Sequence, residues 1–390
     1  MSSIQIEKAR IEDYEEVINL SNYVFSMVRA PIDFPVLIPK LCKREYFMDG
    51  ITYILKDGKR IIGVTGAYPI NIEFSGGTVL PGRGIGMVAV HPDYRFRGYM
   101  KELMNIALDD MKKDNMAFCC LAGRRHRYET YGFTPAGSNY VFNVNEDNIS
   151  HTLGKNRKSS LDIKLVTSED SSILDQIQRL HEAKSVRMQR SREKLFYILS
   201  SWKARVFAVL DGDKFEGYFV YRTNLHDISE INLNNISRIG EVIDLVLRRR
   251  RENYFAEAPV LGSISVTAGP NETEKLAVLS GLAESCSKNH PFQFNILDFK
   301  RFVEPFIKLK AGHHSVGSGS FAVNIRGTQE EKLVLGDGTP SPKEIDLNPM
   351  DAVKFFFSPF PDMTFPVIRE NGFLQNLLPL PLFFESADQV

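Results

Sequence analysis

The stretch from residue 84 to residue 111 most limits what this chain can fold into, because its apolar pattern changes there from strand-like to helix-like. The run GIGMVAVHP is typical of a β-strand and stops at Pro92, which cannot donate a hydrogen bond to a sheet. The helix predicted after it carries one apolar stripe at i, i+3, i+4, i+7, i+8 and i+11. Its members are Met100, Leu103, Met104, Ala107, Leu108 and Met111. A strand, a short turn and a long amphipathic helix in this order predict an α/β fold.

The turn between that strand and that helix, Arg95-x-x-Gly98-x-Met100, has the chemistry of an anion-binding loop. Backbone N–H groups at the start of a helix have no partner within the helix, and the helix dipole is positive there. Gly98 lets the backbone approach a ligand closely, and Arg95 and Arg97 supply charges suited to phosphate oxygens. The ordinary start of a helix is the alternative for so short a motif. In this strand–loop–helix setting we expect a pyrophosphate, with the rest of its ligand along the preceding strand.

The opening of the chain recurs in weaker form downstream, which predicts a duplicated α/β module. Residues 163–183 repeat the strand–loop–helix plan of residues 4–22. Residues 205–222 repeat the strand–Asp-Gly–strand plan of residues 52–68. The second copy lacks the glycine loop, so we expect it not to bind the same ligand.

These patterns predict three domains, in residues 1–148, 149–295 and 296–390. The first two would be α/β domains with mixed sheets, and the third a small α+β domain. In the third, Asn348-Pro349 has the residue types of a helix N-cap and first helical position.

Composition and charge exclude several classes of function. The 48 basic residues balance 48 acidic ones, the pI is about 7.1 and neither end carries a basic run, so we expect neither nucleic acid nor membrane as a partner. No apolar stretch approaches the roughly 18–20 residues that span a bilayer, and the first residues lack the apolar part of a signal peptide. The four cysteines form no CxxC pair and no disulfide framework, so a cytoplasmic location is expected. A homo-oligomer is compatible with all of this.

The segment MVAVHPDYRFRGYMKELM, with the strand MAFCCLA and a Tyr-x-x-x-Gly-Phe element after it, resembles the GNAT acetyltransferases. That family carries the signature R/Q-x-x-G-x-G/A between a strand and a helix, and Met100 stands where it prefers Gly or Ala. The resemblance implies acetyl-CoA as cosubstrate, with the pantetheine arm along the strand and the pyrophosphate in the loop. The implied cofactor-binding residues are Met87, Val88, Ala89, Val90, Arg95, Phe96, Arg97, Gly98, Tyr99, Met100, Gly123 and Arg124.

The element AGRRHRYETYGFTPAG, the second GNAT-like copy and the small C-terminal domain resemble the Eis-type (enhanced intracellular survival) acetyltransferases over the whole chain. Those enzymes have a GNAT domain, a degenerate GNAT domain and a sterol-carrier-protein-like (SCP2-like) domain. The resemblance implies that Tyr128 is the general acid and that the terminal carboxylate of Val390 is the general base. Val390 is aliphatic where aromatic ends are more familiar in that family. His126, Glu129 and a water chain are the alternatives for the base.

The implied function is that of an acetyl-CoA-dependent N-acetyltransferase without a metal. The acceptor would be a primary amine of a small molecule, aminoglycoside-like or polyamine-like, or a lysine side chain. The chemistry agrees, because a base must take a proton from the amine and a phenol can return one to the departing thiolate. The alternative is a lipid- or acyl-binding protein, with the apolar clusters 355–357 and 377–378 lining a pocket in the C-terminal domain. Plain core packing is the simpler explanation of both clusters.

Overall fold

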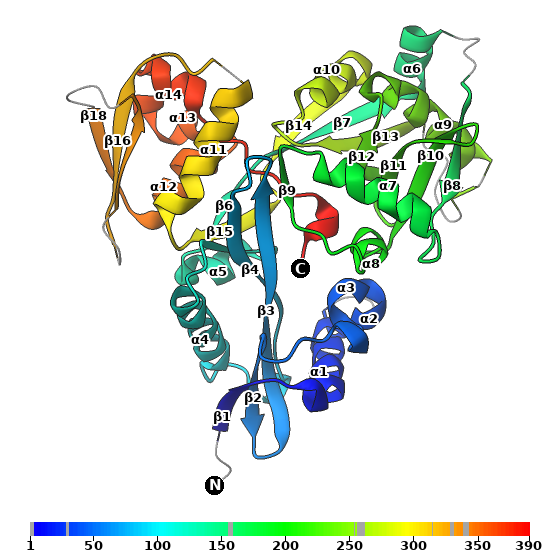
Figure 1. Cartoon of the computed structure of the whole chain (residues 1–390). Helices are drawn as coiled ribbons and strands as arrows, with labels where there is room; N and C mark the ends of the chain where they lie inside the picture. Colours follow the sequence, from blue (N-terminus) through cyan, green and yellow to red (C-terminus); the bar gives the residue numbers. More distant parts are fainter. Residues whose placement is uncertain are drawn as a thin grey trace. The chain divides into compact units, whose positions relative to one another are not determined.

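The structure is a computed structural model that describes residues 4–28, 31–154, 159–252, 254–255, 262–313, 315–327, 331–337 and 343–390. The chain divides into two compact units (Figure 1). The first comprises Met1–Gly137, His290–Leu380 and Gln389–Val390, and the second comprises Ser138–Asn289 and Pro381–Asp388.

The first unit contains a large mixed sheet in the order β1–β2–β3–β4–β5–β15–β6, in which β4 and β5 are parallel. The strands are β1 Ile4–Lys8, β2 Thr52–Asp57, β3 Arg60–Phe74, β4 Val79–Val90, β5 Phe118–Leu121, β6 Thr134–Ala136 and β15 Phe292–Ile296. The helices are α1 Tyr14–Ser26, α2 Phe34–Leu37, α3 Pro39–Cys42, α4 Tyr99–Lys113 and α5 Arg125–Tyr128. Figure 1 shows α1 and α4 on opposite sides of this sheet. The predicted apolar stripe of α4 is confirmed, because its members from Leu103 to Met111 are buried.

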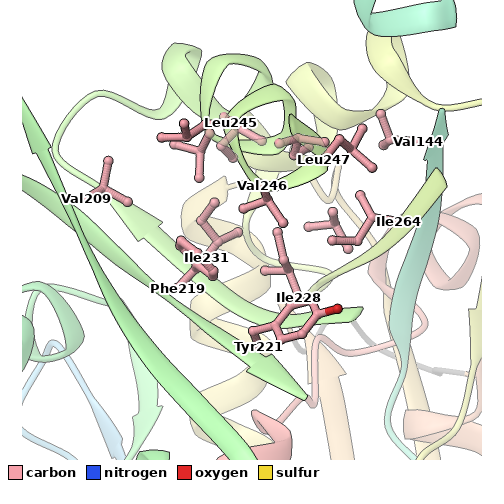
Figure 2. Close-up of a cluster of buried hydrophobic side chains, with 14 of the residues drawn as sticks. Val144, Val209, Phe219, Tyr221, Ile228, Ile231, Leu245, Val246, Leu247 and Ile264 are labelled. Carbon is pink, nitrogen blue, oxygen red and sulfur yellow. The ribbon is translucent and has the colours of Figure 1, made fainter. Parts of the chain in front are cut away.

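The second unit contains another large mixed sheet, in the order β14–β7–β13–β12–β11–β10–β8. The strands are β7 Asn139–Asn145, β8 Leu161–Leu165, β10 Ala204–Asp211, β11 Lys214–Arg222, β12 Asp227–Leu233, β13 Ser263–Ala268 and β14 Ser285–Asn289, with β9 Val186–Met188 as a further short strand. The helices are α6 Glu146–Leu153, α7 Ser171–Glu182, α8 Leu195–Leu199, α9 Ile239–Arg251 and α10 Thr273–Leu282. Figure 2 shows apolar side chains of α9, among them Val246, facing strand residues such as Ile231 and Ile264.

The two large sheets share one hairpin in detail, which supports the predicted duplication. In β2–β3, Leu55 pairs with Gly63, and the register then shifts before the Asp57-Gly58 turn. In β10–β11, Val209 pairs with Gly217, and the register shifts at the same distance from the Asp211-Gly212 turn. Each glycine therefore lies next to an extra residue in the second strand, as expected of a β-bulge.

The strands are distributed differently from the ranges that the sequence predicts. β7 lies within residues 1–148 but pairs with β13 and β14 in the second sheet. β15 lies at the boundary 295/296 and completes the first sheet between β5 and β6. Hydrophobic patterns identify strands, but they do not show which of two open sheet edges a strand will join.

The C-terminal part of the first unit forms a small third sheet with helices, in the order β17–β16–β18. Its elements are α11 Phe299–His313, β16 Ser320–Ile325, β17 Glu331–Gly336, β18 Lys343–Leu347, α12 Pro349–Phe357, α13 Pro361–Thr364 and α14 Gly372–Leu377. The predicted N-cap is confirmed, because the side chain of Asn348 accepts a hydrogen bond from the Asp351 N–H at 2.9 Å. Phe355, Phe356 and Phe357 are all fully buried, and the Phe357 ring lies 5.4 Å from that of Phe302 in α11. This cluster packs as core.

Within the described residues, no helix is long and apolar enough to cross a membrane.

Candidate functional site

Strands β4 and β5 diverge in the middle of the first sheet. The two strands pair in parallel only from Gly82 to Gly84 of β4, although β4 continues to Val90. Among the strands that the structure describes, none pairs with this edge of β4 beyond Gly84. Such an edge can bind an extended ligand as a further strand would bind.

A β-bulge lies at the point where the strands have separated. Val64 of β3 pairs with Ala89 and Gly66 with Gly86, so that Met87 and Val88 together stand opposite one residue of β3. Met87 accordingly has a positive φ of 52°. The bulge bends β4 and changes the direction of its backbone groups. The hydrophobic periodicity of the sequence cannot locate such a bulge, because the pattern of apolar residues continues through it without a break.

The predicted anion-binding loop is formed by residues 95–98. Gly98 is the N-cap of α4 with φ of 86°, a left-handed conformation that favours glycine. Phe96 also has a positive φ, of 64°, and its side chain is fully exposed. The first N–H groups of α4 lie directly after this loop, where the helix offers unpaired donors and a positive dipole end.

A pocket of about 540 Å³ joins the free edge of β4 to this loop. Eight of the twelve predicted cofactor-binding residues line it: Val88, Ala89, Val90, Arg95, Phe96, Gly98, Tyr99 and Met100. Its remaining lining residues, which the sequence analysis missed, are Val24, Phe25, Val28, Tyr94, Lys101, Arg127 and Tyr131. Most of the lining is apolar, and Arg95, Lys101 and Arg127 add positive charge to it.

Four predicted cofactor-binding residues do not line the pocket. Met87 is buried in the bulge, where its Sδ accepts a hydrogen bond from the Tyr68 hydroxyl at 2.8 Å. Arg97 turns back on the loop, donating to the Asp93 carbonyl at 3.1 Å. Gly123 and Arg124 lie after β5, and the Gly123 carbonyl accepts a hydrogen bond from Gln293 at 2.8 Å.

Tyr128 lies at the end of α5, beside the end of β5. Its ring is so close to Gly123 that a Cβ there would lie 2.8 Å from ring carbon Cε2. Burial raises the pKa of the Tyr128 phenol, so the group stays protonated at neutral pH and can act as a proton donor. Tyr131, one turn further on, lines the pocket directly. Burial raises the pKa of Tyr131 too.

The alternative bases lie in the same segment but are less suited to the role. His126 is exposed to solvent. Glu129 forms an ion pair with Arg125, so one of its carboxylate oxygens already has a partner.

The chain end lies on β4, next to the bulge. A Cβ at Gly84 would lie closer than 3.0 Å to one methyl group of Val390 and 3.1 Å from the other. A Cβ at Gly86 would lie 3.3 Å from the carboxyl carbon of Val390. The terminal carboxylate therefore lies against Gly86, in the part of β4 that has separated from β5.

Comparison with known proteins agrees with this geometry. The family profile described as "Acetyltransferase (GNAT) domain" matches residues 5–136. Residues 5–136 form a GNAT acetyltransferase domain. This match confirms the prediction of an enzyme of the GNAT class, for which an acyl-CoA is the implied cosubstrate.

Solved structures resemble the chain well beyond its GNAT domain. A probable N-acyltransferase from Enterococcus faecalis is 17% identical, with 98% of each chain covered and a TM-score of 0.63. A GCN5-related N-acetyltransferase from Anabaena variabilis is 14% identical, with 98% of each chain covered and a TM-score of 0.66. Eis1 from Mycobacterium abscessus is 13% identical, with 98% of each chain covered and a TM-score of 0.59. The predicted Eis-like fold, with two large mixed sheets and a small third sheet, is confirmed. No curated protein sequence matches the chain.

The second unit lacks the loop that distinguishes the GNAT domain. Between β12 and α9 the chain reads Asn-Asn-Ile-Ser-Arg, and the N-cap of α9 is Arg238 with a negative φ. The arginines at the end of α9 have structural partners. Arg249 forms an ion pair with Asp162 at 3.0 Å, and the buried Arg250 donates to the Ser263 carbonyl at 2.8 Å. These contacts explain the basic run without a phosphate ligand.

The second unit also contains a buried cluster of charges that includes residues of the C-terminal tail. The side chain of Arg190 is fully buried and donates two hydrogen bonds to Glu230, each of 2.9 Å. It donates two more to Asp388, of 2.7 and 2.9 Å. The sequence held no signal for this cluster, because its members are far apart along the chain.

Lys184 forms an ion pair with Glu385, a second carboxylate of the C-terminal tail in this unit. Its Nζ lies 2.7 Å from Glu385, 3.8 Å from Glu272 and 4.0 Å from Glu230. Burial raises the pKa of Glu385 to about 7. Attraction by Lys184 lowers this pKa, whereas repulsion by Glu230 and Glu272 raises it further. Lys184, Glu272 and Glu385 line a pocket of about 180 Å³ in this unit.

Proposed function

We propose that the chain is an N-acetyltransferase that moves the acetyl group of acetyl-CoA to a primary amine. One observation carries this proposal: a single pocket joins the strand edge freed by the separation of β4 from β5 to the glycine loop before α4. An extended arm with a pyrophosphate at one end fits that combination. The similar solved structures, described as N-acyltransferases and N-acetyltransferases, support it.

The chain's own groups have separate roles in binding the cosubstrate. Backbone groups of Val88 to Val90 that face away from β3 would bind the amides of the pantetheine arm. The loop from Arg95 to Met100 and the first N–H groups of α4 would bind the pyrophosphate. Gly123 and Arg124 would make secondary contacts beyond β5.

The transfer itself needs one proton to leave the amine and one to reach the thiolate. The amine nitrogen attacks the thioester carbonyl, the C–N bond forms and the C–S bond breaks. Val390 would accept the amine proton through its carboxylate, directly or through water. Tyr128, protonated because burial raises its pKa, would donate a proton to the CoA sulfur. An N–H group of β4 near the bulge would stabilise the developing oxyanion.

The acceptor that we propose is an aminoglycoside-like or polyamine-like small molecule or a lysine side chain. The terminal carboxylate on β4 suits a cationic acceptor, because its negative charge attracts an ammonium group. The buried thiols Cys42, Cys119 and Cys120, all unpaired, fit a reducing cytoplasm.

The test is to incubate the whole chain with acetyl-CoA and a panel of primary amines while measuring free CoA thiol. Turnover with at least one amine and calorimetric binding of one CoA per chain are expected. Binding of two CoA molecules would contradict our interpretation of the second unit. Absence of CoA binding, with stabilisation by fatty-acyl or sterol ligands instead, would favour the lipid-binding alternative.

A further inference from the structure

Three glycines alternate along β4, at positions 82, 84 and 86. Alternate residues of a strand point to the same face of the sheet, so this face of β4 has no side chains over three consecutive positions. Ile85, between two of them, points to the other face, where it is buried in the core with Leu103 and Met104 of α4.

The space left by each glycine is occupied by a different group. The Phe118 ring occupies the space at Gly82, and the isopropyl group of Val390 occupies the space at Gly84. At Gly86, the ring of Tyr68 and the carboxyl carbon of Val390 both lie 3.3 Å from the position of a Cβ. The last residue of the chain thus covers two of the three glycines.

Tyr68 limits the space on the other side of the chain end. It is almost fully buried, and its hydroxyl donates to Met87 at 2.8 Å. Its ring also covers Gly66 of β3, the residue paired with Gly86, where a Cβ would lie 2.5 Å from the ring. The Tyr68 ring and the terminal valine therefore lie side by side over a patch of sheet without side chains.

We propose that Gly84 and Gly86 are positioning residues that hold the chain's own terminal carboxylate at the reaction centre. Gly84 makes room for the branched side chain of Val390, and Gly86 lets the carboxyl group lie against the backbone next to the bulge at Met87. Both methyl groups of Val390 lie over Gly84. The proposal rests on the proposed function of the Val390 carboxylate as the base.

The test introduces a steric clash between residue 84 and the side chain of Val390, and then removes it with a second substitution. Gly84→Ala places a methyl group where the side chain of Val390 lies, which displaces the carboxylate and should lower kcat about 100-fold, in the range for loss of a general base. The calorimetric Kd for CoA should change less than twofold, because the pocket lining begins at Val88. With its base displaced, the enzyme should also shift its pH–rate profile to higher pH, because only amine that is already neutral reacts.

Relief of the clash distinguishes positioning from a general effect on the sheet. Val390→Ala removes both methyl groups and keeps the carboxylate, so the double variant Gly84→Ala/Val390→Ala should regain at least tenfold in kcat over Gly84→Ala. Gly82→Ala is the matched control, because its methyl group meets Phe118 and Val390→Ala should not rescue it. Gly76→Ala, in open space, should behave as wild type. A double variant no more active than Gly84→Ala, or equal rescue of Gly82→Ala, would overturn the proposal.

A second experiment applies if Gly84→Ala fails to fold. The wild-type strand is kept and Val390 alone is deleted, which leaves the space over Gly84 empty. N-acetylvaline should then restore at least a tenth of the lost turnover at millimolar concentration, whereas N-acetylvalinamide, which lacks the carboxylate, should not. Equal restoration by both compounds, or by neither, would contradict the positioning role. Wild-type turnover is measured in parallel, so that failure of the proposed acetyl transfer is seen separately.

Discussion

Arg190→Met should destabilise the second unit by about 3 kcal/mol. The variant keeps much of the side-chain volume and removes four hydrogen bonds to two buried carboxylates, Glu230 and Asp388. Loss of one partner of a buried ion pair costs about 3–5 kcal/mol, because the other charge stays buried without compensation. We expect the lower end of this range, since Glu230 still accepts hydrogen bonds from Tyr218 and Asn232.

The single tryptophan of the chain, Trp202, lies in the second unit and reports its unfolding by fluorescence. With a urea m-value of about 2–3 kcal/mol per molar, the midpoint should fall by roughly 1 M. Arg192→Met is the matched control, because Arg192 is partly exposed and its ion pair with Asp175 is worth less than about 1 kcal/mol. Arg190→Met/Glu230→Gln should recover part of the loss. Equal midpoints for Arg190→Met and Arg192→Met would show that the buried ion pairs of Arg190 contribute no more than an exposed one.

Four further predictions concern the site and the tail. Gly98→Val should raise the KM for acetyl-CoA at least tenfold, because a branched residue strains the left-handed backbone at φ of 86° by about 1–2 kcal/mol. Unchanged CoA binding by calorimetry would contradict pyrophosphate binding by the loop from Arg95 to Met100. Tyr128→Phe should lower kcat about 100-fold with CoA affinity retained, and so should, separately, deletion of residues 389–390. Near-normal turnover after the deletion would mean that another group is the base. Glu385→Gln should gain stability relative to wild type as the pH rises from about 4.5 to 7, by up to about 3 kcal/mol. The reason is that Glu385 ionises only near pH 7 in the folded protein but near pH 4.5 in the unfolded chain. Denaturation midpoints of the two proteins that differ by a constant amount across this pH range would exclude a raised pKa of Glu385.

Much of the pocket beside β4 could be predicted from the sequence, because its signals are local. The loop from Arg95 to Met100 combines a glycine at a left-handed position with the start of an amphipathic helix, and both features lie within a few residues. The four expected residues that do not line the pocket show the limit of this reasoning. Arg97, for example, has the right charge and place in the sequence, but its guanidinium donates to the Asp93 carbonyl.

The sequence alone predicts the strand–loop–helix of the GNAT domain, the repeated Asp-Gly hairpin and the apolar face of α4. Hydrophobic periodicity and the preference of glycine for positive φ depend only on neighbouring residues, so they are visible in one dimension. Three features could be found only in the folded chain: β15 joins the first sheet, α1 supplies Val24 and Phe25 to the pocket, and Val390 lies over Gly84. Each of these contacts joins residues far apart in the chain, and each depends on which sheet edges and surfaces are left open once the local elements have formed.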